Sequence, residues 1–207
     1  MKRGKFITFE GIDGAGKSTH LAWAADFLHG HDVGLIVTRE PGGTVLGEQL
    51  RRILLAGEQQ IHPETEALMM FTARRQHVED VILPALRRGD WVLCDRFTDA
   101  SFAYQGGGRG VVKDKLKALE CWVHPDLQPD LTLLFDVSAE LGQSRVARIR
   151  SPDRFEREDV EFFSRVRNTY LERLQQCPNR MVRIDGSKPI ADIQGEIEQR
   201  LLAIWKK

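Results

Sequence analysis

Short apolar segments rich in β-branched residues alternate along this chain with longer segments whose apolar residues recur at helical spacing. Segments as apolar as the short ones are typical of strands that are buried on both faces of a sheet. The predicted strands are Lys5–Glu10, Val33–Thr38, Trp91–Asp95, Leu131–Val137 and Met181–Asp185. The predicted helices cover residues 17–29, 45–56, 64–88, 111–123, 139–149, 158–176 and 189–205.

This alternation predicts an α/β fold in which five parallel strands form one sheet, with helices over both of its faces. Pro63 and Pro189 stand where helices begin, and Gly89 stands where one ends. No repeat, low-complexity stretch or linker divides the 207 residues, so we expect one domain over residues 1–207. Ligands of such sheets bind beyond the carboxyl ends of the strands.

Composition argues against several classes of function. The 30 Lys and Arg residues balance the 30 Asp and Glu residues, whereas nucleic-acid-binding proteins usually carry a basic excess. Cys94, Cys121 and Cys177 are far apart and the six histidines show no metal spacing, so we expect a cytoplasmic protein without disulfides or a zinc site. No apolar stretch approaches the roughly 20 residues that cross a bilayer, and the first residues do not resemble a signal peptide.

A phosphate-binding loop follows the first predicted strand. The pattern GxxxxGK[ST] is present between a strand and a helix, the setting in which backbone N–H groups surround phosphate oxygens. We expect Lys17 to reach the β- and γ-phosphates of ATP and the Ser18 hydroxyl to ligate Mg²⁺. The predicted ATP-binding residues are Gly11, Ile12, Asp13, Gly14, Ala15, Gly16, Lys17, Ser18 and Thr19.

The loop alone does not name the reaction, because ATPases, GTPases and kinases share it. The alternative is a glycine-rich turn that binds nothing. The Asn-Lys-x-Asp motif by which GTPases read guanine is absent from the sequence.

Three arginine-bearing segments are predicted at the carboxyl edge of the sheet. Arg39 follows the second strand, Arg96 follows the third, and Arg74 lies on the long helix between them. Because a guanidinium group grips phosphate with two hydrogen bonds, these arginines indicate a second phosphate-bearing ligand. Taken singly, Arg39 could form a surface ion pair with Glu40, Arg96 could pair with Asp95, and Arg74 could lie on a solvated helix face.

At these segments the chain resembles the thymidylate kinase family, and the resemblance covers nearly the whole chain. The strings that carry it are Phe9–Ser18 (FEGIDGAGKS), Thr38–Thr44 (TREPGGT), Asp95–Phe97 (DRF) and Ser101–Gly110 (SFAYQGGGRG). The resemblance implies a P-loop kinase that transfers the γ-phosphoryl group of MgATP to dTMP. It also implies a homodimer, and a lid over residues 145–158.

The resemblance further implies roles for individual residues. Arg39 and Arg96 would hold the dTMP 5′-phosphate, and Arg74 would bind the thymine edge. Tyr104 would lie under the deoxyribose, and Asp13 would approach the 3′-hydroxyl or the metal shell. Asp95 would support Mg²⁺ through water. The full dTMP-binding set is Asp13, Arg39, Pro41, Phe71, Arg74, Arg96, Ser101, Tyr104 and Gln105.

One position departs from the family pattern. The family places a base-stacking Phe four residues before the helix arginine, where this chain has Met70. Phe71 lies three residues before Arg74 and four before Arg75, and both spacings share a helix face. We expect Phe71 and Arg74 to contact the base, with plain core packing as the alternative for Phe71.

The lid segment is rich in arginine. Arg145, Arg148, Arg150, Arg154 and Arg157 crowd thirteen residues, which Ser151-Pro152 interrupts. Residue 15 is Ala, so the chain resembles family members, including many bacterial ones, that supply the catalytic arginine from the lid. We expect that arginine to be Arg150, with Arg148 and Arg154 as rivals, and expect Arg145 to stack on adenine. The alternative is an exposed helix of mixed charge.

The expected chemistry needs no general base. The acceptor phosphate is largely dianionic at pH 7, so catalysis should consist of positioning and charge neutralisation. The predicted catalytic residues are Lys17, Arg150, Arg148, Arg96 and Asp13. Two alternatives are another small kinase of the same fold and a nucleotide-binding regulatory ATPase.

Overall fold

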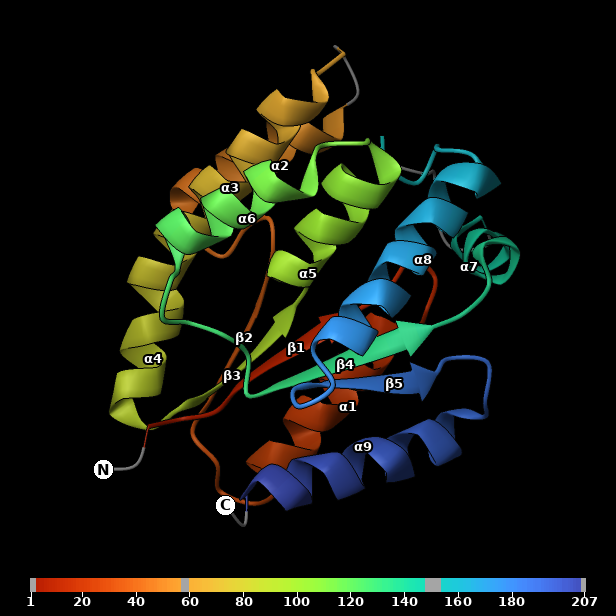
Figure 1. Cartoon of the computed structure of the whole chain (residues 1–207). Helices are drawn as coiled ribbons and strands as arrows, with labels where there is room; N and C mark the ends of the chain where they lie inside the picture. Colours follow the sequence, from red (N-terminus) through yellow and green to blue (C-terminus); the bar gives the residue numbers. More distant parts are fainter. Residues whose placement is uncertain (1–2, 57–59, 148–153, 206–207) are drawn as a thin grey trace.

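Five parallel strands form one sheet in the computed structural model, which describes residues 3–56, 60–147 and 154–205. The strands are β1 Phe6–Glu10, β2 Leu35–Arg39, β3 Trp91–Asp95, β4 Leu131–Asp136 and β5 Met181–Asp185, in the order β2-β3-β1-β4-β5 (Figure 1). Every residue of β1 and β4 is buried, as their apolar sequences require. The predicted α/β fold with five parallel strands is confirmed.

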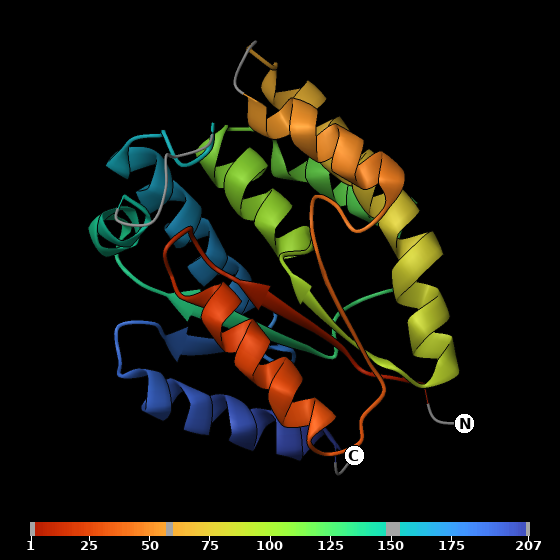
Figure 2. The ribbon, with the colours of Figure 1, turned by 180° about the vertical axis from the view of Figure 1, so that it is seen from behind.

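Helices cover both faces of this sheet. α1 and α9 lie against one face, whereas α4, α5 and α8 lie on the other (Figures 1 and 2). The α-helices are α1 Lys17–His29, α2 Val45–Ala56, α3 Pro63–His77, α4 Leu83–Arg88, α5 Thr98–Ser101, α6 Lys113–Val123, α7 Ala139–Val146, α8 Val160–Gln176 and α9 Ile190–Trp205. No helix among the described residues is both long and apolar enough to cross a membrane.

In the structure, the long helix predicted over residues 64–88 consists of three consecutive helical segments. A π-helical stretch, η1 Val78–Ile82, joins α3 to α4. Pro84 lacks the N–H that would donate to the Asp80 carbonyl, and a widened turn before it accommodates the loss. Pro63 occupies the first turn of α3, and Gly89 ends α4 in the left-handed conformation, as predicted.

Residues 98–108 are helical, which the sequence analysis did not predict. α5 continues into a second π-helical segment, η2 Phe102–Gly108, although this segment ends in three glycines. A Cβ atom on Gly107 would lie 2.1 Å from Thr169 Oγ1 of α8. The glycines therefore permit a close helix–helix approach, and this packing outweighs their weak helix propensity.

The sheet register sets the place of the site. Arg39 at the end of β2 pairs with Asp95 at the end of β3, and Phe9 near the end of β1 pairs with the same Asp95. The segments that follow β1, β2 and β3 therefore leave the sheet side by side.

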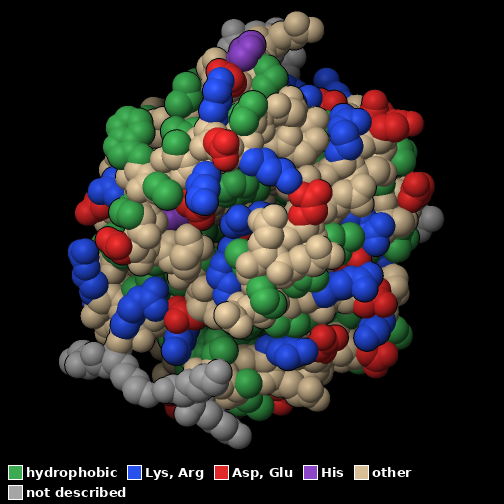
Figure 3. All heavy atoms as spheres, viewed as in Figure 1, with side chains coloured by type: hydrophobic (Ala, Val, Ile, Leu, Met, Phe, Trp, Pro, Cys, Tyr) green, Lys and Arg blue, Asp and Glu red, His purple; other side chains and the backbone are tan. Residues whose placement is uncertain are grey.

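Acidic and basic side chains are mixed over the face shown in Figure 3, without a continuous basic patch.

Candidate active site

The loop after β1 folds as a phosphate-binding loop. Gly11, Gly14 and Gly16 have φ angles of 133°, 76° and 98°, a region that favours glycine. A Cβ atom on Gly14 would also lie 2.1 Å from the carbonyl oxygen of Gly142 in α7. Lys17 folds back over the loop, and its Nζ donates to the carbonyl oxygens of Gly11 at 3.1 Å and Ile12 at 2.9 Å.

A cavity of about 1000 Å³ extends from this loop along the carboxyl edge of the sheet. Asp13 to Thr19 line it, whereas Gly11 and Ile12 are buried and contact Lys17 through their carbonyl oxygens. The predicted dTMP-binding residues on its wall are Asp13, Arg39, Pro41, Arg74, Arg96, Ser101, Tyr104 and Gln105. One continuous cavity thus brings together most of the residues predicted for the two nucleotides.

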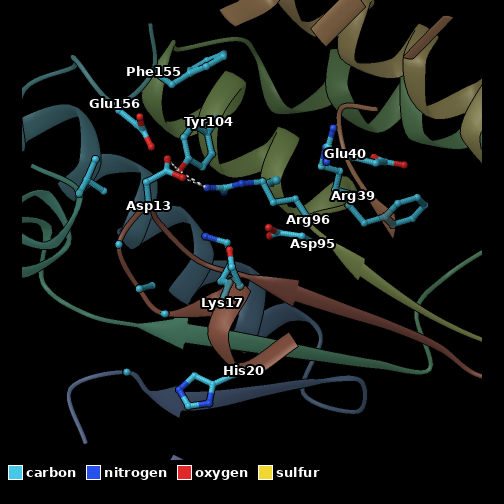
Figure 4. Close-up of a pocket in the computed structure, with 18 of the residues that line it drawn as sticks. Asp13, Lys17, His20, Arg39, Glu40, Asp95, Arg96, Tyr104, Phe155 and Glu156 are labelled. Atoms are coloured by element: carbon cyan, nitrogen blue, oxygen red, sulfur yellow. Dashed lines mark hydrogen bonds and ion pairs between the residues drawn. The ribbon is translucent and has the colours of Figure 1, made fainter. Parts of the chain in front are cut away.

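Arg96 joins the end of β3 to the phosphate-binding loop. Its guanidinium donates to the Gly11 carbonyl oxygen at 2.9 Å. It also donates to Asp13 Oδ1 at 2.8 Å and to Tyr104 Oη at 3.0 Å (Figure 4). The backbone of Arg96 has a φ of 70°, in the left-handed region that is sparsely populated by residues with a side chain. The ion pair of Arg96 is formed with Asp13 rather than with its neighbour Asp95.

Asp13 is held as a carboxylate within this group. Tyr104 donates its hydroxyl to Asp13 Oδ2 at 2.9 Å. Burial acts to raise the pKa of Asp13, but the positive charges of Arg96 and Lys17 outweigh it and lower the pKa to about 2. Asp13 is therefore ionised at neutral pH and neutralises part of the positive charge around the loop.

Arg74 is held at the far end of the cavity by a buried carboxylate. Glu40 Oε2 accepts from Arg74 Nε at 2.7 Å, and Glu40 Oε1 pairs with His77 Nδ1 at 2.9 Å. The second ring nitrogen of His77 bonds to Thr38 Oγ1 at 2.7 Å. Burial opposes ionisation of Glu40, but Arg74 and His77 keep its pKa below the usual range.

The remaining guanidinium hydrogens of Arg74 are directed in part to the cavity wall. Its Nη2 donates to Ser101 Oγ and to the Phe97 carbonyl oxygen, both at 3.1 Å. Its Nη1 is buried and has no hydrogen-bond partner among the described residues. A buried donor without a partner beside a cavity is suited to an acceptor atom on a ligand.

Arg39 is more weakly held than Arg74. It is about half exposed and forms an ion pair with both carboxylate oxygens of Glu48, at 3.1 Å and 3.0 Å. The surface ion pair considered from the sequence is therefore present, but its partner is Glu48, because Glu40 turns inward to Arg74. An exposed pair of this kind contributes only about 0.2–1 kcal/mol, so an arriving phosphate can displace Glu48.

The expectation that Phe71 lines the base site is corrected by the structure. Phe71 is 1% exposed and packs in the core between α3 and α6, with its ring 4.6 Å from the Arg74 guanidinium carbon. Met70 lines the cavity instead. Arg75 points away from the cavity, to the Val123 carbonyl oxygen and Glu79, so the cavity arginine of this helix is Arg74.

A magnesium ion is compatible with the residues beside Lys17. Asp95 Oδ1 is buried and has no hydrogen-bond partner among the described residues, although Asp95 lines the cavity together with Ser18. A carboxylate oxygen and a hydroxyl oxygen are suitable ligands for Mg²⁺ or for its bound waters. The described residues contain no cluster of three His, Cys, Asp or Glu side chains that would form an all-protein metal site.

The arginines predicted for the lid differ in where the structure places them. Arg145 lines the cavity and donates to the carbonyl oxygens of Gly14 at 3.3 Å and Gly186 at 3.0 Å, which joins the phosphate-binding loop to the loop after β5. Arg148 and Arg150 lie outside the described residues. Arg154 does not line the cavity; its Nε donates to the Leu54 carbonyl oxygen at 2.7 Å.

Glu10 is a buried residue of the site that the sequence analysis did not assign. Glu10 Oε1 accepts from the backbone N–H of Phe97 at 2.7 Å, and Oε2 accepts from the Tyr170 hydroxyl at 2.8 Å. It thereby holds the backbone directly after Arg96. A charged residue at the end of an otherwise apolar strand is the signal that identifies it in the sequence.

A family model described as thymidylate kinase matches residues 9–197. The chain belongs to the thymidylate kinase family. It is 57% identical to a thymidylate kinase of Nitrosomonas europaea over 205 residues, which are 99% of this chain and 95% of the relative. A relative from Cupriavidus taiwanensis is 59% identical over 204 residues, covering 98% of this chain and all of the relative.

A solved structure agrees with this assignment. The crystal structure of thymidylate kinase from Ehrlichia chaffeensis has a TM-score of 0.79 and 33% identity, covering 97% of this chain and 99% of that chain. The membership of the thymidylate kinase family that the sequence resemblance implied is therefore confirmed.

We predict that replacing Glu10 by Gln makes stability less dependent on pH. Burial and the charge of Asp99 raise the pKa of Glu10 to about 8. Between about pH 5 and about pH 8 the folded protein keeps a proton that the unfolded chain has released, so stability falls as pH rises, by at most about 1.4 kcal/mol per pH unit. Urea unfolding across this range measures the slope.

The matched control is Glu64→Gln, since Glu64 is exposed and its pKa is lowered by Lys115, so it titrates below this range. The Glu10→Gln slope should be shallower than that of the native protein, and the Glu64→Gln slope should match the native one. Equal slopes in all three proteins would show that Glu10 is ionised throughout the range.

Proposed function

We propose that this protein phosphorylates dTMP to dTDP with MgATP as donor, in the synthesis of dTTP. The observation that carries the proposal is one cavity with two different ends. The phosphate-binding loop and Lys17 form one end, and Arg39 and Arg74 line the other. Arg96 lies between them. The relatives' names support the choice of dTMP, since they are thymidylate kinases over nearly the full length of this chain.

We assign the acceptor end to dTMP. Arg39 and Arg96 bind the 5′-phosphate, and Arg74 binds the thymine edge with its unpartnered Nη1. Met70 takes the place at the base that the sequence analysis gave to Phe71. Tyr104 lies below the deoxyribose and disfavours a 2′-hydroxyl. The other members of the assigned dTMP set are Asp13, Pro41, Ser101 and Gln105.

We assign the donor end to MgATP. The phosphate-binding loop surrounds the phosphates, and Arg145 stacks on adenine beside Gly186 and Lys188 of the loop after β5. Ser18 would ligate Mg²⁺ directly and Asp95 would hold it through water. The ion would neutralise negative charge on the transferred phosphoryl group.

The proposed mechanism is electrostatic. The acceptor oxygen belongs to a phosphate that is largely dianionic at pH 7, so no residue has to remove a proton. The main barrier is the approach of two anions, which Lys17 and Arg96 reduce by neutralising charge and by fixing the groups in line. Asp13 keeps Arg96 oriented through their ion pair at 2.8 Å.

We propose Arg150 as the arginine that engages the transferred phosphoryl group, with Arg148 as its rival for this role. Arg150→Ala should lower kcat by at least about 100-fold and change dTMP affinity little, since the contact forms in the transition state. Single-turnover kinetics and dTMP titration measure the two quantities. Native turnover in this variant would remove Arg150 from the role.

We predict that Arg39→Ala raises the Kd for dTMP by roughly 10-fold or more, because a charge-assisted pair of hydrogen bonds to phosphate is lost. The fold should be unaffected, since Arg39 is half exposed and its ion pair with Glu48 lies at the surface. Arg75→Ala is the matched control, and it should bind dTMP within about twofold of the native protein. Equal affinities in the two variants would exclude Arg39 from the acceptor site.

A panel of acceptors tests the proposed function itself. A coupled assay of ADP release should give a rate with dTMP well above the rates with dUMP, dCMP, dGMP and AMP. A preference for another acceptor would indicate a different kinase of the same fold. Slow ADP release that no acceptor stimulates would indicate a regulatory ATPase.

We further propose a cytoplasmic homodimer built from one P-loop domain per chain, with a lid over residues 145–158. α3 and α6 pack side by side and carry exposed apolar side chains. These are Leu68 on α3, Trp122 on α6 and Val112 directly before α6, which are 52%, 80% and 57% exposed. Apolar exposure of this kind suits a subunit interface. Sedimentation at assay concentrations should give twice the 23.6 kDa chain mass, and a species of 23.6 kDa alone would contradict the dimer.

A further inference from the structure

Arg154 reaches from the lid segment to two helices beside the acceptor end of the cavity. Its Nε donates to the carbonyl oxygen of Leu54 in α2 at 2.7 Å, and its Nη2 forms an ion pair with Glu66 of α3. The Arg154 side chain is only 15% exposed. Its guanidinium is thus committed to protein partners and not to the donor phosphates.

Glu66 is a fully buried carboxylate with two further partners, from η2 and the residue directly after it. Its Oε1 accepts from Gln105 Nε2 at 2.9 Å, and its Oε2 lies 3.5 Å from Nε of Arg109, which follows η2. Arg109 in turn pairs with Glu158 at 2.6 Å. A buried carboxylate needs such partners, because losing one leaves its charge uncompensated.

The residue after Arg154 covers part of the cavity. Phe155 is 6% exposed and lines the cavity, with its ring 6.0 Å from the ring of Tyr104 (Figure 4). The Arg154 guanidinium lies 4.5 Å from the Phe155 ring, which links the two positions. The ion pair between Arg154 and Glu66 therefore holds Phe155 at the wall of the acceptor site.

We propose that Glu66 is a positioning residue that holds residues 154 and 155 beside the acceptor site through its ion pair with Arg154, and we call this ion pair the latch. The latch holds Phe155 at the cavity wall and connects Arg154, through Glu66, to Gln105 on the same wall. This inference rests on the proposed kinase function. With Phe155 held at the cavity wall, water would be excluded from the acceptor site, so ATP is not hydrolysed without an acceptor.

A double-mutant cycle with Arg154→Met and Glu66→Gln tests the latch. Each variant should lower kcat by about 10-fold or more, because Phe155 is held at the acceptor site for a smaller fraction of the time. Each should also raise the ratio of ADP released to dTDP formed. The double variant should lose no more than about twofold beyond either single variant, since both break the same contact. Melting curves confirm that the variants are folded.

Glu64→Gln is the matched control on the same helix. Glu64 pairs with Lys115 at the surface, and its substitution should leave kcat and the ADP to dTDP ratio within about twofold of native. If Glu66→Gln unfolds at the assay temperature, Glu66→Asp replaces it in the cycle, as it keeps the charge on a shorter side chain.

Three results would overturn the latch while leaving the kinase function intact. The first is a native kcat and a native ADP to dTDP ratio in both single variants. The second is a fall in kcat in the double variant equal to the product of the two single falls. The third is a fall in kcat in Arg154→Met that Glu66→Gln does not show. The last result would assign Arg154 to direct phosphate contact. Failure of the native protein to release ADP in response to dTMP would instead contradict the proposed function.

Discussion

The ion pair between Arg96 and Asp13 is the interaction on which the site depends. It links the end of β3 to the loop after β1, two segments that the sheet register already places side by side. Arg96 adopts a left-handed backbone conformation to make this contact, and Glu10 secures the backbone directly after it. The loop after β1 and the segment after β3 therefore meet at one guanidinium, between the two ends of the cavity.

The other cavity arginines are held with very different strength, and this difference suits their proposed roles. Arg74 is buried and fixed by Glu40, whose second oxygen is held by His77. A rigid guanidinium with one nitrogen that has no partner in the described part of the chain is appropriate for hydrogen bonding to the edge of a base. Arg39 is half exposed and paired with Glu48, so it can change partners when a phosphate arrives. Buried pairs thus provide shape, and the exposed pair provides adaptability.

The sequence predicted the sheet, most helices and the phosphate-binding loop, because strand burial and loop glycines leave strong local patterns. It did not predict the helical turns over residues 98–108, since their glycines are explained by contact with α8, far away in the chain. Most predicted dTMP residues line the cavity, but Phe71 does not, because one helical step of about 100° separates it from Met70. The partners of Arg39, Arg74 and Arg154 are likewise set by tertiary packing rather than by sequence neighbours.

The central claim is that one cavity holds two nucleotides whose phosphates meet at Arg96. Calorimetric titration of dTMP, with and without a saturating non-hydrolysable MgATP analogue, tests it most directly. The account predicts one dTMP and one ATP analogue bound to each chain at the same time. Competition between the two ligands for a single place would contradict it.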